Sequence, residues 1–105
     1  MEKRMLNTDE EIMLYAVEIW GQRSQIEMAQ EEATELALAC RKFIRVISDE
    51  NFQNLGSEIA DVEIMISQLK LMFPRLEEIS VEQKIKKMHR LKFRLYKHQF
   101  EGDET

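Results

Sequence analysis

The chain is poor in residues that interrupt helices, with three glycines and one proline among its 105 residues. This scarcity of turn-forming residues favours an all-α protein. No segment shows the sustained alternation of apolar and polar residues that is typical of strands, and the apolar spacing is helical throughout. The length suits a single domain with its own core. We therefore expect a helical domain over residues 1–100 and a disordered tail at residues 101–105.

The chain also lacks the features of a secreted, membrane-spanning or nucleic-acid-binding protein. The single cysteine, Cys40, cannot form an internal disulfide, which indicates a small core residue in a reducing compartment. The N-terminus has no signal-like apolar stretch, and no run approaches the roughly 20 apolar residues of a membrane span. A net charge of −5 argues against a general nucleic-acid binder. We expect a cytoplasmic protein with no nucleic-acid partner and no membrane partner.

Start and stop signals divide the chain into four helical segments. Candidate capping boxes begin at Thr8, Ser24 and Ser80, each followed three residues later by Glu or Gln. Gly21 separates the first two helices, and Pro74 ends a third helix expected over about residues 51–73. The fourth helix is expected to reach about residue 99. This order of elements predicts an all-α four-helix bundle.

The first helix is apolar on nearly every side, since residues 12–20 read IMLYAVEIW. A monomer of this size cannot easily bury so wide an apolar surface, and a helix of this kind suggests burial between subunits. The sequence therefore predicts a homo-oligomer, at least a dimer.

Two later segments place acids on apolar helix faces: residues 31–35 read EEATE and residues 57–61 read SEIAD. With a rotation of about 100° per residue, Glu32 and Glu58 fall inside the apolar arcs of their helices. Glu35 and Asp61 fall at the edges of these arcs, and Glu31 falls just outside. Each helix thus presents a pair of carboxylates, one turn apart, toward the core.

Buried carboxylates need a positive partner, because an unpaired buried charge is strongly destabilising. The two apolar arcs contain no basic residue, so a hard divalent cation with oxygen ligands is the better partner. Either acidic pair alone is more typical of a solvated helix face, whereas two pairs on adjacent core-facing arcs favour a metal site. Coordination positions of the cation that the carboxylates leave open would be filled by water or substrate phosphates, as is usual for Mg²⁺.

The order EExxE followed by ExxD resembles the MazG-like all-α nucleoside triphosphate pyrophosphohydrolases. Further segments, WGQRSQIEMAQEEATELALA, NLGSEIADVEIMISQL and KKMHRLKFRL, are similar to the small single-domain members found in phages and Gram-positive bacteria. The resemblance covers roughly residues 15–95 and implies a four-helix fold of the MazG-like type.

The resemblance also implies an activity, which is Mg²⁺-dependent cleavage of a nucleoside triphosphate to the monophosphate and pyrophosphate, with Mn²⁺ as a possible substitute. A housecleaning role in the nucleotide pool would follow. The implied metal ligands are Glu32, Glu35, Glu58 and Asp61, and Glu31 would help to hold a second metal or orient the attacking water. Many relatives carry a Lys…Asn pattern in the fourth helix, whereas this chain has no Asn after residue 54.

The fourth helix is strongly basic and is the candidate phosphate-binding element. A triphosphate carries about four negative charges and requires cations. Lys84, Lys87 and Arg90, with Arg94 behind them, are the expected contacts, and the alternative is a solvated face that pairs with surface acids.

Two further residues are candidates for contact with the substrate. Trp20 can stack on a base or belong to the core. Asn54, one turn before Glu58, can contact the ligand or cap its helix. The rival interpretation of the whole chain is a non-enzymatic helical oligomerisation or interaction module, whose acids are vestigial or bind a regulatory cation.

Overall fold

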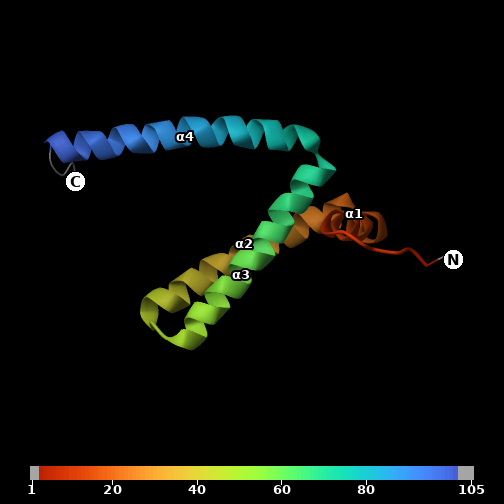
Figure 1. Ribbon diagram of the computed structural model, residues 1–105. Helices are drawn as coiled ribbons and strands as arrows, with labels where there is room; N and C mark the ends of the chain where they lie inside the picture. Colours follow the sequence, from red (N-terminus) through yellow and green to blue (C-terminus); the bar gives the residue numbers. More distant parts are fainter. Residues whose placement is uncertain (1–2, 102–105) are drawn as a thin grey trace. The chain divides into compact units, whose positions relative to one another are not determined.

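The computed structural model describes residues 3–101, and within this range the chain forms four α-helices and no strand. The helices are α1 (Asp9–Trp20), α2 (Gln22–Arg45), α3 (Asp49–Met72) and α4 (Pro74–Glu101) (Figure 1). The all-α class and the number of helices are confirmed. The predicted tail begins at Glu101, which is the last residue of α4, and residues 102–105 lie outside the described part.

The chain divides into two compact units, one ending at Phe73 and the other beginning at Pro74. The first unit contains α1, α2 and α3, and the second contains α4. The packing of all four helices into one MazG-like bundle stays a prediction.

Side-chain caps begin two of the helices. The Thr8 hydroxyl accepts a hydrogen bond from the Glu11 N–H at 3.1 Å, so the predicted N-cap at Thr8 is confirmed. The Glu11 carboxylate accepts from the Asn7 N–H and the Thr8 hydroxyl, where a full capping box would use the Thr8 N–H. The hydroxyl of Ser48 accepts from the Asn51 N–H at 3.1 Å, and α3 therefore begins at Asp49, slightly earlier than expected. Both caps satisfy backbone donors that have no partner within the helix.

The other two predicted caps are wrong, because backbone breaks begin these helices first. Ser24 lies inside α2, which begins directly after Gly21. Gly21 has a φ of 89°, a value that favours glycine, and this turns the chain sharply between α1 and α2. Ser80 lies inside α4, which begins at Pro74, and its hydroxyl donates to the Glu77 carbonyl at 3.1 Å. Proline suits a first helical position because its missing N–H would have no helical partner there.

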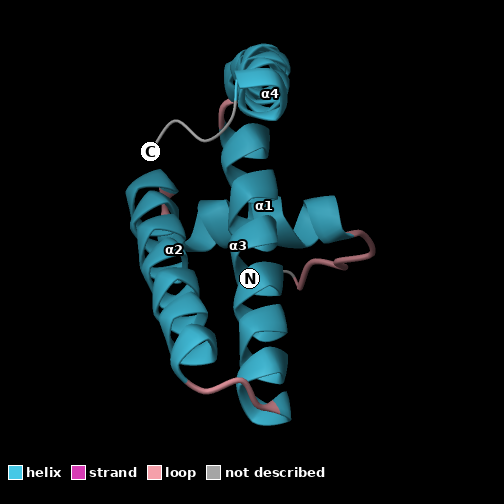
Figure 2. Ribbon diagram, turned by 90° about the vertical axis from the view of Figure 1, so that its left-hand side faces the viewer, coloured by secondary structure: helices cyan, strands magenta, loops and turns pink. Residues whose placement is uncertain are grey.

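Helices α2 and α3 form an antiparallel hairpin, and α1 packs across it (Figure 2). The connection at residues 46–48 is closed by Asn51, whose Nδ2 donates to the Val46 carbonyl at 2.8 Å. Next to this turn the rings of Phe43 and Phe52 pack with their centroids 5.7 Å apart. These contacts tie the two long helices together at one end.

The buried core of the described residues is small. Its apolar members are Ala39 and Met65, and two amide side chains, Gln25 and Gln68, are equally buried. Cys40, expected in the core, is exposed on α2. Within residues 3–101, no helix is both long enough and apolar enough to cross a membrane.

Both units expose large apolar side chains. On α1 these include Leu14, Ile19 and Trp20, and on α4 they include Ile85, Met88 and Leu95. Exposed apolar surface of this extent is typical of interaction surfaces. It supports the prediction of self-association, which no contact in a single chain can test.

We expect the protein to have a mass of at least twice 12.5 kDa in solution at micromolar concentration. Light scattering coupled to gel filtration measures this directly. Leu14→Lys should lower the mass, because it places a charge on the exposed surface of α1. Ile47→Lys, which changes an exposed residue of the α2–α3 connection, is the control and should leave the mass unchanged. A wild-type mass of 12.5 kDa would refute the prediction.

Candidate metal centre

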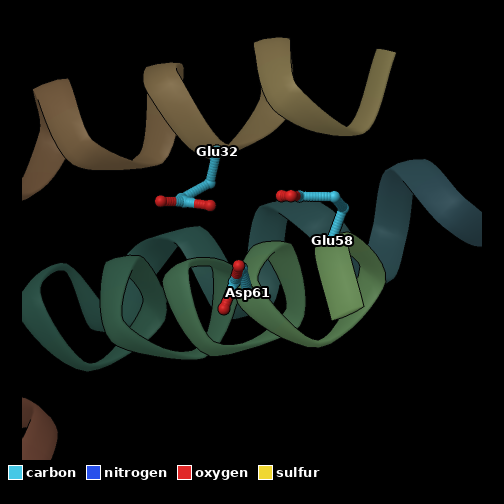
Figure 3. A group of neighbouring side chains, drawn as sticks. All are labelled: Glu32, Glu58 and Asp61. Atoms are coloured by element: carbon cyan, nitrogen blue, oxygen red, sulfur yellow. The ribbon is translucent and has the colours of Figure 1, made fainter. Parts of the chain in front are cut away.

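Helices α2 and α3 bring three acids together: Glu32 from α2, and Glu58 and Asp61 from α3. Figure 3 shows Glu32 extending from α2 toward α3, with Glu58 reaching up from α3 and Asp61 on the α3 helix near them. One carboxylate oxygen from each residue lies within 4.8 Å of the other two, and all three residues are half-buried. We call this group the carboxylate cluster.

The helical repeat explains why these acids face one another. On α2, Glu32 lies two turns after buried Gln25 and two turns before buried Ala39, so the three residues share one stripe. On α3, Glu58 and Asp61 continue the spacing of three and four residues that leads to buried Met65. The two stripes are the surfaces along which the hairpin packs. The acids are therefore held at the helix interface by their place in the repeat.

The electrostatics of the cluster are those of crowded acids without a counter-charge. Burial raises the pKa of Glu32, and repulsion by the neighbouring Asp61 and Glu58 raises it further, with smaller contributions from a hydrogen bond to Asp61 and from Glu35. No cation contributes to this shift. In addition, Oε2 of Glu58 is buried and accepts no hydrogen bond from the described residues. The site has the charge and the unsatisfied oxygen that a cation would neutralise.

The remaining acids of the predicted site lie outside the cluster. Glu35, expected as a fourth ligand, is exposed one turn further along α2, and Glu31 is also exposed. Together with Glu32 they line a shallow depression on the surface of α2. The three acids of the EExxE motif thus border one surface, although only Glu32 reaches the α3 acids.

The other predicted contacts divide between the two units. Asn54 is half-buried on α3, one turn before Glu58, and Trp20 is 65% exposed at the end of α1. The four basic candidates, Lys84, Lys87, Arg90 and Arg94, are exposed on α4 in the second unit. Their contact with phosphate stays a prediction.

A pocket of about 240 Å³ opens beside the cluster, between α1, α2 and α3, and we call it the three-helix pocket. Glu32 and Asp61 belong to its wall, so the pocket and the cluster share two carboxylates. Most of the remaining wall is apolar and includes Trp20, Met28, Ile64 and Met65. Two buried amides, Gln25 and Gln68, complete it.

Gln68 is the site residue that the sequence analysis missed. It is 3% exposed, and its Nε2 donates to the Met13 carbonyl of α1 at 2.9 Å. The signal was present in the helical spacing, because position 68 continues the α3 stripe of Glu58, Asp61 and Met65. Its place on that stripe predicts that Gln68 is buried, for the same reason that it predicts burial of the acids.

Comparison with known proteins gave no match to any family model, any curated protein or any solved structure. The resemblance to the MazG-like enzymes therefore rests on the sequence motifs alone.

We expect Mg²⁺ or Mn²⁺ to raise the melting temperature of the protein above that in a monovalent salt of equal ionic strength. Binding to the folded state alone stabilises it by about 2.7 kcal/mol at 100 times the dissociation constant. Glu58→Gln should be at least as stable as wild type in EDTA, because it relieves repulsion, and it should lose most of the Mg²⁺ shift. Glu63→Gln, an exposed acid of α3 outside the cluster, should keep the full shift. A Glu58→Gln protein that responds to Mg²⁺ like wild type would count against the site.

The raised pKa of Glu32 predicts a pH-dependent loss of stability in the metal-free protein. A carboxyl with a higher pKa in the folded state destabilises the fold when ionised, and this loss disappears as the pH falls through the folded-state pKa. In EDTA, Glu32→Gln should therefore melt above wild type at pH 7 to 8. The difference should vanish below the ordinary Glu pKa of about 4.3.

Thermal melts at a series of pH values measure this difference. The exposed neighbour Glu31, changed to Gln, is the control and should show a much smaller pH-dependent difference from wild type. A difference for Glu32→Gln that is constant with pH, or that grows toward acid, would contradict the electrostatic account of the cluster.

Proposed function

We propose that this protein is a Mg²⁺-dependent nucleoside triphosphate pyrophosphohydrolase of the MazG-like type, acting in nucleotide-pool housecleaning. The observation that carries the proposal is the carboxylate cluster, which lies against a largely apolar pocket between three helices. Uncompensated acids beside an apolar pocket suit a ligand that combines a phosphate-bound cation with an aromatic ring.

The donor atoms of the cluster fit a hard divalent cation. All three ligand atoms are carboxylate oxygens, and no His or Cys belongs to the group, so the site suits Mg²⁺ or Mn²⁺ better than a metal that prefers nitrogen or sulfur. The buried Oε2 of Glu58, with no hydrogen bond from the described residues, is the atom that gains most from a cation. Mg²⁺ typically takes one or two carboxylates and completes its shell with water and substrate phosphates.

In this proposal each acid has a defined task. Glu32, Glu58 and Asp61 hold the ion, and Glu35 completes the set from the next turn of α2. A bound Mg²⁺ would polarise the phosphoryl oxygens of the substrate. Exposed Glu31 accepts a hydrogen bond from the attacking water and orients it toward the α-phosphorus. The water oxygen forms a bond to the α-phosphorus and gives its proton to Glu31. The bond from the α-phosphorus to the bridging oxygen breaks, and pyrophosphate leaves with that oxygen.

The basic side chains of α4 supply the positive charge that the triphosphate requires. Lys84, Lys87, Arg90 and Arg94 are all exposed and available to a ligand. These cations belong to a helix whose apolar side chains are also exposed. We therefore propose that α4 contacts the triphosphate when the homo-oligomer forms.

A second candidate function is a helical interaction module without catalysis. It is favoured by the exposed apolar side chains of α1 and α4, which are sufficient to explain association with another chain. In that case the carboxylate cluster binds a regulatory cation or none. The two candidates differ in one measurable product, which is pyrophosphate.

A pyrophosphate-release assay with canonical and modified nucleoside triphosphates in Mg²⁺ tests the proposal. The wild-type protein should release pyrophosphate and the matching monophosphate in equal amounts. Glu58→Gln should reduce turnover more than about 100-fold, since changes to residues around a metal ligand already cost 10–100-fold. Glu63→Gln is the matched control and should stay close to wild type. No pyrophosphate from any nucleotide, with either Mg²⁺ or Mn²⁺, would overturn the enzymatic proposal and favour the interaction module.

A further inference from the structure

We propose that α4 pairs in the antiparallel direction with α4 of a second copy of this chain, along an apolar stripe that the helix leaves exposed. Such pairing would form one interface of the predicted homo-oligomer, and it involves neither the cation nor the nucleotide. The stripe consists of five apolar side chains that are each 44–60% exposed: Val81, Ile85, Met88, Leu91 and Leu95.

The stripe has no cover within its own unit. Among the described residues the second unit consists of α4 alone, and none of its residues is buried. The five apolar side chains border one open groove along the helix. Most of the stability of a helix in a protein comes from packing its apolar face, and contiguous exposed apolar surface marks interaction sites. A partner that covers the stripe would therefore stabilise α4.

The spacing of the stripe is that of a helix that pairs with another helix. Val81, Met88 and Leu95 are seven residues apart, and Leu91 follows Met88 by three residues. Apolar residues at alternating intervals of three and four form the seam of a coiled coil. Lys84 occupies the seam position between Val81 and Met88, where its aliphatic stem can cover apolar surface while the ammonium group stays in water. The pattern predicts a helical partner with the same repeat, which a second α4 provides.

The charges beside the seam argue against a parallel pair. Lys87 and Lys92 are exposed and flank the stripe on its two sides. In a parallel pair each flank of one helix faces the opposite flank of its partner, so Lys87 of each copy would lie beside Lys92 of the other. Symmetry would make two such contacts. Like charges brought together in this way are repulsive and select against the parallel direction.

The antiparallel direction aligns the apolar residues of the two stripes. When Val81 lies opposite Leu91 of the second copy, the symmetry of the pair also places Leu91 opposite Val81 of that copy. Ile85 then meets Ile85 of the second copy near the two-fold axis. The apolar residues between positions 81 and 91 thus cover one another, and the seam positions interlock as in other paired helices.

The same alignment turns the flanking charges into attractive pairs. Each flank now faces the same flank of the partner, so exposed Glu78 lies beside Lys92 of the second copy. Symmetry makes two of these Glu–Lys contacts. Lys87 meets Lys87 of the second copy near the two-fold axis, which is a single repulsive contact. Charge complementarity therefore favours the antiparallel pair over the parallel one.

Cross-linking through single cysteines tests the pairing on the full-length chain. Every variant also carries Cys40→Ser, which removes the one native thiol. Ile85→Cys places a thiol near the two-fold axis, so a short bis-maleimide should join two copies into a covalent dimer. Gln83→Cys is the matched control, because this exposed residue lies on the opposite side of α4, and it should give no covalent dimer. Circular dichroism checks that each variant is folded.

Two further variants determine the direction of the pair. Leu91→Cys alone should give no covalent dimer, since its two copies would be ten residues, or about 15 Å, apart along an antiparallel pair. Leu91→Cys co-expressed with a Val81→Cys chain that carries a size tag should give the mixed dimer. Efficient cross-linking of Leu91→Cys to itself would indicate a parallel pair and would overturn the antiparallel assignment.

A charge exchange tests the contact that sets the direction. In the Ile85→Cys chain, Glu78→Lys and Lys92→Glu should each weaken the pairing about tenfold, because each turns two attractive contacts into repulsive ones. The two changes together restore opposite charges and should recover the original affinity. The yield of covalent dimer over a dilution series measures this affinity. Two single variants that pair as well as the parent, or a double variant that stays weak, would overturn the role of Glu78 and Lys92.

The remaining outcomes separate this pairing from the proposed function. The absence of a dimer from Ile85→Cys, in a protein that light scattering reports as an oligomer, means that a different surface covers the stripe, and it overturns the pairing. A wild-type monomer does the same. No readout uses nucleotide or cation, so a protein that pairs through α4 and releases no pyrophosphate supports the pairing and overturns only the enzymatic proposal.

Discussion

The fold holds three mutually repelling carboxylates at the interface of its two longest packed helices, and the structure around them prevents their separation. The α2–α3 hairpin is tied at its turn by Ser48, Asn51 and the ring contact of Phe43 with Phe52. Further along, Ala39 is almost fully buried at the interface. On the other side of the cluster, Gln25 of α2 and Met65 of α3 are buried. With the helices held on both sides, the acids can relieve their repulsion by side-chain rotation, by protonation or by a bound cation.

The same interface explains why α1 matters to the site. The hydrogen bond from Gln68 Nε2 to the Met13 carbonyl joins α3 to α1, and the two residues are 55 positions apart in the sequence. It places α1 over the hairpin, so that Trp20 and the acids border one pocket. A buried amide makes this connection at some cost, because its oxygen is left without a donor from the described residues.

The helical periodicity of the sequence was enough to predict that Glu32 and Glu58 face the helix interface. The side-chain capping patterns were not enough to predict where every helix begins. The arcs of α2 and α3 placed Glu32 and Glu58 inward because burial follows the 3.6-residue repeat. Glu35 sat at an arc edge, where a small rotation of the helix decides between interface and solvent, and it is exposed. Ser24 and Ser80 matched capping patterns, yet Gly21 and Pro74 begin the helices earlier because backbone geometry outranks a side-chain bond.

A first unit whose buried apolar residues are Ala39 and Met65 should draw part of its stability from what binds it. Three places are candidates for such binding: the carboxylate cluster for a cation, the three-helix pocket for part of a ligand, and the exposed side of α1 at Leu14 for a second chain. The first two share Glu32 and Asp61, so a cation that draws these carboxylates together also reshapes the pocket wall. Cation and nucleotide should therefore bind with coupled affinities, each raising the affinity for the other by the same factor. Association through Leu14 involves neither carboxylate and should depend less on the cation.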